Sequence, residues 1–103
     1  MKLLSLNDDN FDKSVQSGVS IVDFWAIWCG PCRLMTPVVE DIAKEMTDIN
    51  VYKLNVDDHP ELTAKFNIMS IPTVIIFKDG VEVDQTVGVV SKSVLAKKIK
   101  NYI

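Results

Sequence analysis

The sequence is short of several features, and each shortage excludes a class of protein. No stretch approaches the roughly 18 consecutive apolar residues of a membrane-spanning helix. The formal net charge of −3 on 103 residues provides no basic surface for nucleic acid or for an acidic membrane. With only two cysteines, the chain has no framework of disulfides. We therefore expect neither a nucleic-acid partner nor a membrane partner.

The amino terminus also lacks the pattern of a secretory signal. Residues 1–4 begin an apolar run, but residues 7–10 are polar and end it after a few positions. The apolar region of a signal peptide needs roughly 7 to 15 residues. We therefore expect a cytoplasmic protein, and in that reducing compartment structural disulfides are rare.

What the chain does contain is the composition of one folded domain. Hydrophobic residues make up 48% of the sequence and charged residues 24%, which is typical of a globular protein. The length fits a single domain over 1–103, and no repeat or low-complexity linker divides it.

Hydrophobic spacing alternates between strand and helix periods along this domain. The run 19–26 is almost continuously apolar, which is typical of a central strand covered on both faces. Helical spacing starts at Pro31, and Pro37 is expected to kink that helix. We expect strands at 2–6, 19–26, 51–56, 73–77 and 82–87, and helices at about 7–17, 31–46, 60–66 and from Ser91 onward. This order predicts an α/β fold with one mixed five-stranded sheet flanked by four helices.

A few residues indicate where these elements begin and end. Asn7 is expected to cap the first helix, and Gly18 to end it. Asp79 and Gly80 are typical of the tight turn of a hairpin. Ser91 is expected to cap the last helix.

The segment Trp28-Cys29-Gly30-Pro31-Cys32 contains the chemistry. It lies between the predicted central strand and the long helix, at a strand end where α/β proteins place active groups. Cysteines three apart on a helical turn are close enough to form a disulfide. Cys29 would occupy the helix N-terminus, whose free N–H groups and dipole favour a thiolate, while Cys32 would be less exposed. The pattern indicates one thiol that attacks and one that resolves.

Spacing contributes more to this chemistry than acidity does. Lowering a thiol pKa from about 8.5 to about 7 raises the thiolate fraction at pH 7 roughly fifteenfold, but it removes roughly fivefold of nucleophilicity, so the net gain is about threefold. The larger advantage is that the second cysteine attacks within the same molecule, at a high effective concentration.

Three other interpretations of the cysteine pair stay open on the residues alone. The pair can be half of a zinc site, although His59 is the only histidine and the other ligands would have to be carboxylates or come from a second chain. It can be a structural disulfide, although so short a loop adds little stability. It can also be two inert thiols, although a helix start beside Trp28 argues against inertness. The residues favour redox chemistry, and we expect no metal.

The motif and its surroundings resemble the thioredoxin family. The segment 24–33, FWAIWCGPCR, is similar to the active-site signature of that family. Further similarities follow in the same order along the chain, at 53–57, 71–73, 78–80 and 87–88. The resemblance covers essentially the whole sequence.

This resemblance implies a fold and a function. It implies the thioredoxin fold for a single thioredoxin domain, and a protein-disulfide reductase whose redox group is a disulfide between Cys29 and Cys32 rather than a bound cofactor. Its substrates would be proteins that contain disulfides. Electrons would come from NADPH through a thioredoxin reductase, and we expect a monomer.

The resemblance also implies roles that local pattern does not decide. Asp23 is a lone carboxylate in an apolar strand. The residues alone favour a position at a strand edge that faces water. The resemblance instead implies that Asp23 is buried and accepts the proton of Cys32. Lys53 would by default face solvent, but the resemblance places it close to Asp23. Gly30, Pro31 and Lys53 are then expected to tune the redox reaction.

The bond before Pro72 is another such position. A generic X-Pro bond is cis in only about 5–6% of cases, so the residues alone predict trans, whereas the resemblance implies cis. It further implies an apolar docking surface for an extended substrate, made of Trp28, Ile71, Pro72, Gly88 and Val89.

Two positions depart from the family pattern. Ile27 stands where a polar residue is common and is expected to make the rim of the site more apolar. Asn67 stands where glycine is common, and asparagine tolerates the left-handed backbone. Trp25 and the four methionines are expected in the core.

Two other functions fit the same sequence. One is a binding module whose apolar face docks a partner while the thiols are incidental. The other is an oxidant or isomerase, which differs from a reductase in its reduction potential.

Overall fold

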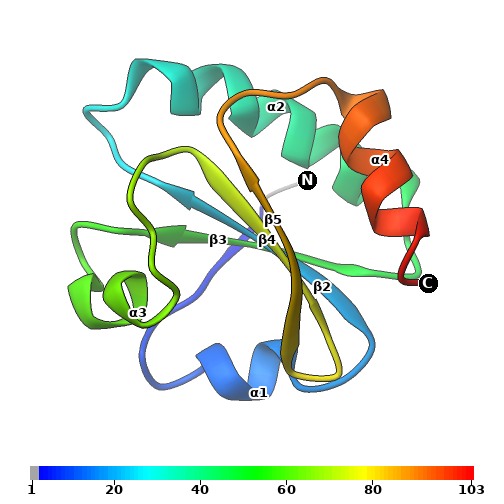
Figure 1. The fold of residues 1–103 in the computed structure, drawn as a ribbon, viewed down its shortest axis with the longest axis horizontal. Helices are drawn as coiled ribbons and strands as arrows, with labels where there is room; N and C mark the ends of the chain where they lie inside the picture. Colours follow the sequence, from blue (N-terminus) through cyan, green and yellow to red (C-terminus); the bar gives the residue numbers. More distant parts are fainter. Residues whose placement is uncertain (1–2) are drawn as a thin grey trace.

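The computed structural model describes residues 3–103, which form one mixed sheet with helices on both faces (Figure 1). The sheet has the strand order β1-β3-β2-β4-β5. The strands are β1 (Leu4–Ser5), β2 (Val19–Trp25), β3 (Asn50–Asn55), β4 (Thr73–Lys78) and β5 (Val81–Val87). The helices are α1 (Phe11–Val15), α2 (Gly30–Glu45), α3 (Pro60–Lys65) and α4 (Lys92–Lys100). The predicted five-stranded mixed sheet with four helices is confirmed.

β2 is the central strand, parallel to β3 and antiparallel to β4. Residues 19–24 are all buried because α2 and α4 cover one face of the sheet and α1 and α3 cover the other (Figure 1). This double cover explains why the strand is almost continuously apolar. Within it, Asp23 stands in register with Lys53 of β3 on one side and Val74 of β4 on the other.

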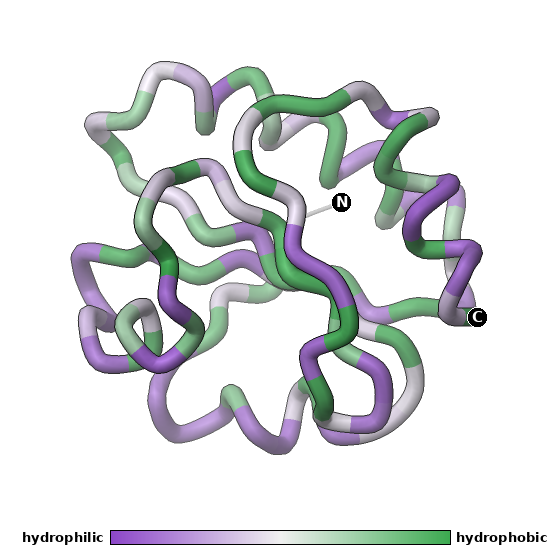
Figure 2. The backbone as a smooth tube through the Cα atoms, in the orientation of Figure 1, coloured by the Kyte–Doolittle hydropathy of each residue, from purple (hydrophilic) through white to green (hydrophobic). Residues whose placement is uncertain are grey.

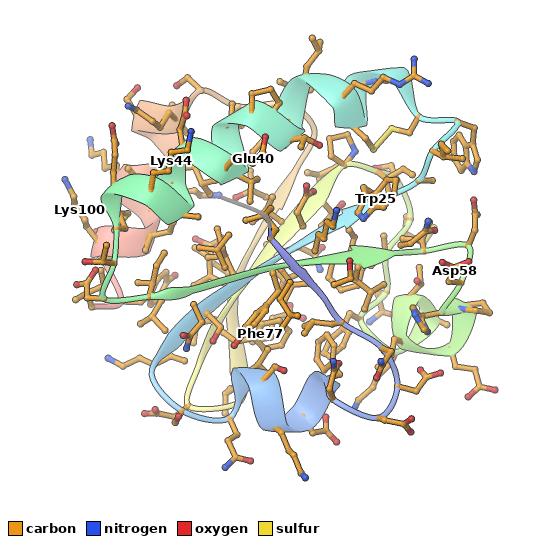
Figure 3. The ribbon with its side chains drawn as sticks, turned by 180° about the vertical axis from the view of Figure 1, so that it is seen from behind. Trp25, Glu40, Lys44, Asp58, Phe77 and Lys100 are labelled. Carbon is orange, nitrogen blue, oxygen red and sulfur yellow. A yellow bond between two sulfur atoms is a disulfide. The ribbon has the colours of Figure 1, made fainter. Side chains whose placement is uncertain are left out.

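Each face of the sheet has its own apolar core. Beneath α2 and α4, buried side chains of both helices pack against the sheet, among them Met35, Ile42, Leu95, Ile99, Ile21 and Ile76. Beneath α1 and α3 the core is aromatic, with Phe11, Phe24 and Phe77 around the half-buried Phe66. In Figure 2 the helices alternate between apolar and polar residues, as helices with one buried face do, and Figure 3 shows Phe77 on the α1 side. The sheet is therefore anchored from both sides.

The first helix is shorter than the sequence predicts. It spans only Phe11–Val15, because Asn7 stabilises a separate turn in front of it: its Oδ1 accepts the N–H of Asp9 and of Asn10, each at 2.9 Å. The predicted cap at Asn7 is thus wrong in position, since Asn10 flanks the helix instead. β1 is also shorter than predicted, and Lys2, which the prediction included, lies outside the described residues.

The local predictions at Ser91 and Asn67 agree with the structure. Ser91 Oγ accepts the N–H of Val94 at 3.3 Å and caps α4. Asn67 has the left-handed φ of 56°. Pro37 lies inside α2, and the kink expected there stays a prediction. None of the helices in residues 3–103 has both the length and the apolar character of a membrane span.

Helix α4 carries the chain away from the start of α2. In Figure 1 the carboxyl terminus lies at the right of the molecule, and α2 begins at the left, beyond the end of β2. The two ends of the sheet therefore hold different features: the cysteines at one end and the chain terminus at the other.

The hairpin between β4 and β5 is tied to the loop before β2. Asp79 and Gly80 adopt φ of 51° and 86°, as the predicted tight turn requires. The Asp79 Oδ1 accepts the N–H of Gly18 at 2.8 Å, and the Asp79 N–H donates to the Gly18 carbonyl at 3.0 Å. Two neighbouring loops are thus fixed to each other at the end of the sheet where β2 starts.

Asp79→Ala is expected to lower the free energy of unfolding by about 1–3 kcal/mol, because alanine loses the bond to Gly18 and is strained at positive φ. Asp79→Asn keeps a side-chain acceptor and tolerates the same φ, so its loss is expected to stay below about 0.5 kcal/mol. Urea unfolding of both variants measures the difference. Equal losses in the two variants would contradict this account.

Candidate active site

The two cysteines form a disulfide at the start of α2 (Figure 3). Their Cα atoms are 5.3 Å apart. A short turn follows β2, in which the Cys29 N–H donates to the Ala26 carbonyl at 3.2 Å, and the helix then begins at Gly30 with Pro31 in its first turn. Proline suits this position because it needs no N–H partner there. The strand, turn and helix together fix the spacing of the two sulfurs.

Cys29 is the N-cap residue of α2. Its Sγ accepts the backbone N–H of Cys32 at 3.2 Å, a position in which a side-chain oxygen usually caps a helix. When the disulfide is reduced, this N–H and the positive end of the helix dipole stabilise negative charge on the Cys29 sulfur. The local geometry thus gives this cysteine the environment of a reactive thiolate.

Both cysteines are largely covered in the oxidised form. Cys29 exposes 4% of its surface and Cys32 exposes 2%, and both pack with Ala26, Trp25 and Ile71. The difference in exposure that the sequence suggested is therefore small. The two cysteines differ more in their contacts. The Cys29 Sγ lies 3.8 Å from the Ile71 carbonyl oxygen, across the site.

Asp23 is buried in the middle of β2, with 2% of its surface exposed and no hydrogen-bond partner for its Oδ1. Burial raises the pKa of this carboxyl to about 7, against the opposing effect of the Lys53 charge. A cavity of about 180 Å³ lies beside it, lined by Leu3, Asp23, Trp25, Thr36 and Lys53. The α2 residue that lines this cavity is Thr36, one helical turn after the second cysteine, and its hydroxyl donates to the Cys32 carbonyl at 3.0 Å.

Lys53 and Trp25 form the strand-side wall of that cavity. The Lys53 Nζ lies 5.6 Å from the centre of the Trp25 ring, a cation–π distance, and the lysine is half-buried rather than solvent-facing. Trp25 is also half-buried, and its Nε1 is buried without a partner. The ammonium group of Lys53, on β3, thus lies against the aromatic face of Trp25, which is on the same strand as Asp23.

The segment before β4 approaches the disulfide from the other side. The Ile71–Pro72 bond is cis, and the Pro72 carbonyl accepts the N–H of Gly88 at 2.8 Å. Val89 follows Gly88 and is exposed. The structure therefore brings Ile71, Pro72 and Gly88 together.

Trp28 stands beside the first cysteine with 67% of its surface exposed. Its Nε1 donates to the Asp57 Oδ2 at 2.8 Å, which holds the indole in place over the surface. Ile27, immediately before it, is also exposed, as the sequence indicates.

This geometry matches that of known proteins over the whole chain. Residues 2–101 match the Thioredoxin family. The thioredoxin of Staphylococcus saprophyticus is 48% identical over 104 residues, and that of Staphylococcus aureus is 44% identical; each alignment covers all of both chains. A solved thioredoxin variant from Halobacterium salinarum superposes with a TM-score of 0.91 at 34% identity, covering 98% of this chain and 90% of that one.

The chain belongs to the thioredoxin family. It has the thioredoxin fold, as the sequence resemblance implied, and it is a thiol–disulfide oxidoreductase whose redox group is the Cys29–Cys32 disulfide. Thioredoxins work with this disulfide and need no prosthetic group. In residues 3–103, no three side chains of the types that ligate metals gather into a metal site.

The sequence predicted no role in the site for Asp57 or Met69. Asp57 follows the end of β3, a position where α/β proteins place functional groups, and that signal was available. Met69 was expected in the core but has 93% of its surface exposed, so that prediction is wrong. Its place in the loop between Asn67 and Pro72 was the signal against burial.

The pKa of Asp23 predicts how stability depends on pH. Its folded value of about 7 lies above the ordinary 3.8, so native stability falls as the pH rises from about 4 through 7. Asp23→Asn removes this penalty and is expected to raise the free energy of unfolding at pH 8 by up to about 4 kcal/mol, with little gain at pH 4. Urea unfolding of the oxidised proteins at both pH values measures the change.

Asp48→Asn, at an exposed position, is the matched control, and its effect is expected to be small and equal at both pH values. A gain in Asp23→Asn that is the same at pH 4 and at pH 8 would contradict the assignment.

Proposed function

We propose that this protein reduces disulfides in other proteins, with Cys29 as the nucleophile and Cys32 as the resolving thiol. The observation that carries this proposal is the position of the Cys29 sulfur, which caps α2 and is bonded to Cys32. The cap stabilises the attacking thiolate, and the bond supports the view that the second thiol reaches the first without rearrangement of the helix.

The reaction proceeds by two exchanges. The Cys29 thiolate attacks one sulfur of the client disulfide; a bond forms between them, the client S–S bond breaks, and one client sulfur leaves as a thiolate. The Cys32 thiolate then attacks the Cys29 sulfur, and the second client sulfur leaves. The client gains two electrons, and the protein ends with the Cys29–Cys32 disulfide.

Asp23 accepts the proton of Cys32 in the second exchange. This role is supported by its raised pKa of about 7, which makes it a base near neutral pH, and by the cavity that extends from it to the turn of Thr36. Lys53 lines the same cavity and limits how far the pKa of Asp23 rises. Gly30 and Pro31 set the spacing of the cysteines at the helix start.

The client lies across Trp28, Ile71, Pro72, Gly88 and Val89 as an extended chain. The proximity of the Ile71 carbonyl to the Cys29 sulfur supports this placement, as does the apolar character of the exposed members. The protein works as a cytoplasmic monomer, a single domain over residues 1–103. A thioredoxin reductase that draws electrons from NADPH reduces it again.

Cys29→Ser is expected to lower insulin reduction by dithiothreitol to the uncatalysed background, because the attacking sulfur is gone. Cys32→Ser is expected to accumulate mixed disulfides with client proteins, which non-reducing gels detect, because the second exchange is blocked. Ser17→Ala, at an exposed position outside the site, is expected to behave as the wild type. Full activity in Cys29→Ser, or no trapped species in Cys32→Ser, would refute these roles.

Asp23→Asn is expected to slow release of the client from a preformed mixed disulfide about tenfold or more at pH 7. At pH 9 the deficit is expected to shrink, because Cys32 loses its proton to solvent without a base. Stopped-flow measurement of client release from pH 6 to 9 tests this. A variant whose pH profile parallels that of the wild type would remove Asp23 from the proton transfer.

A further inference from the structure

A second hollow adjoins the disulfide on the side of α3. It has a volume of about 400 Å³, and its lining residues come from the turn before α2, the end of β3, α3 and the loop to β4: Trp28, Val56, Thr63, Ile68, Met69, Ser70 and Ile71. In Figure 1 α3 and the loop that follows it lie at the same end of the sheet as the start of α2. This hollow, called the side pocket below, is distinct from the cavity at Asp23.

No charged side chain lines the side pocket. Of its two hydroxyl groups, that of Thr63 is occupied, since it donates to the His59 carbonyl at 2.9 Å. In the nearby carboxylate of Asp57, Oδ2 accepts from the Trp28 indole. A charged or amide side chain entering the pocket would lose hydration and gain few partners, whereas an apolar one would lose little.

Met69 is the most exposed of the large apolar side chains that line the side pocket, with 93% of its surface in contact with solvent. So large an exposed fraction leaves most of its apolar surface free to be covered by a visiting side chain. Methionine is flexible and polarisable, so it adapts to apolar groups of different shape. The occupied pocket would thus cover a side chain that the free protein leaves in water.

Two of the residues that line the side pocket are direct neighbours of Cys29. Trp28 directly precedes Cys29, and the carbonyl of Ile71 lies 3.8 Å from the Cys29 Sγ. A client cysteine joined to Cys29 therefore lies beside two walls of the pocket. An extended chain advances about 3.3 Å per residue, so side chains one or two positions from that cysteine are within reach.

We propose that the side pocket receives an aliphatic or aromatic side chain next to the client cysteine, with Met69 as the residue that sets this preference. The protein then reacts faster with cysteines that have an apolar neighbour than with those that have a polar one. This inference rests on the proposed role of Cys29, and it adds the class of substrate.

Eight short peptides test the preference. Each has one cysteine joined by a disulfide to thionitrobenzoate, with either Leu or Gln at one of the two positions before or after the cysteine and serine elsewhere. The Cys29 thiolate of the reduced protein attacks the peptide sulfur, the S–S bond to the reporter breaks, and coloured thionitrobenzoate leaves. Both side chains are uncharged and similar in size, so the Leu/Gln ratio of second-order rate constants measures apolarity alone.

At one or more positions the wild type is expected to give a Leu/Gln ratio of about tenfold. Met69→Gln is expected to reduce that ratio to about twofold or less, and Met69→Leu to retain it. Val81→Gln makes the same kind of change at an exposed apolar residue in the β4–β5 hairpin, and it is expected to leave the ratio unchanged.

A wild-type Leu/Gln ratio below about threefold at all four positions overturns the inference. So does a ratio that stays the same in Met69→Gln, or one that Val81→Gln lowers as much as Met69→Gln does. Reaction with Ellman's reagent, a small disulfide that has no side chain to place in the pocket, separates the two proposals. Wild-type protein that reacts with this reagent but shows no peptide preference disproves only the side pocket. Protein whose reaction with it survives Cys29→Ser disproves the nucleophile assignment as well.

Discussion

The hydrogen bond from the Cys32 N–H to the Cys29 sulfur is the contact on which the rest of the site depends. It exists because the chain leaves the central strand, turns within four residues and starts a helix at Gly30. The same bond closes the first turn of the helix and stabilises charge on the sulfur, so folding and reactivity depend on one geometry. The buried strand β2 supports it, since packing on both faces of the sheet fixes where α2 begins.

Asp23, in the middle of that strand, lowers the stability of the folded protein. A buried carboxyl group in this strand, without a partner for one oxygen, destabilises the folded protein at any pH at which it ionises. The apolar burial on both faces of β2 offsets that penalty. The same burial brings the proton affinity of the group near neutrality, where a base for thiol chemistry is useful. With the proposed role of Asp23 as a base, stability and function make opposite demands on this position.

Much of the fold follows from local sequence pattern, because apolar periodicity and turn residues act over short distances. The strand 19–26, the turn at Asp79 and Gly80 and the cap at Ser91 are of this kind. The first helix was misplaced because Asn7 has two competing uses, and the three-residue turn that it forms has the same sequence signals as a helix start.

Less of the site follows from local pattern, because its parts come from distant segments. Neither the cis bond at Pro72 nor the burial of Asp23 has a local signal strong enough to outweigh the ordinary preference, and both expectations came from family resemblance. The contact between Trp28 and Asp57 joins residues 29 positions apart. The exposure of Met69 depends on the path of a loop, which composition does not determine.

The position of the carboxyl terminus has a practical consequence. Because α4 ends at the side of the molecule away from the start of α2, a tether or fusion partner attached there projects away from the proposed client surface (Figure 1). The protein immobilised on beads through that end keeps its reactive face turned toward the solution, which suits the capture of disulfide-linked clients from a mixture.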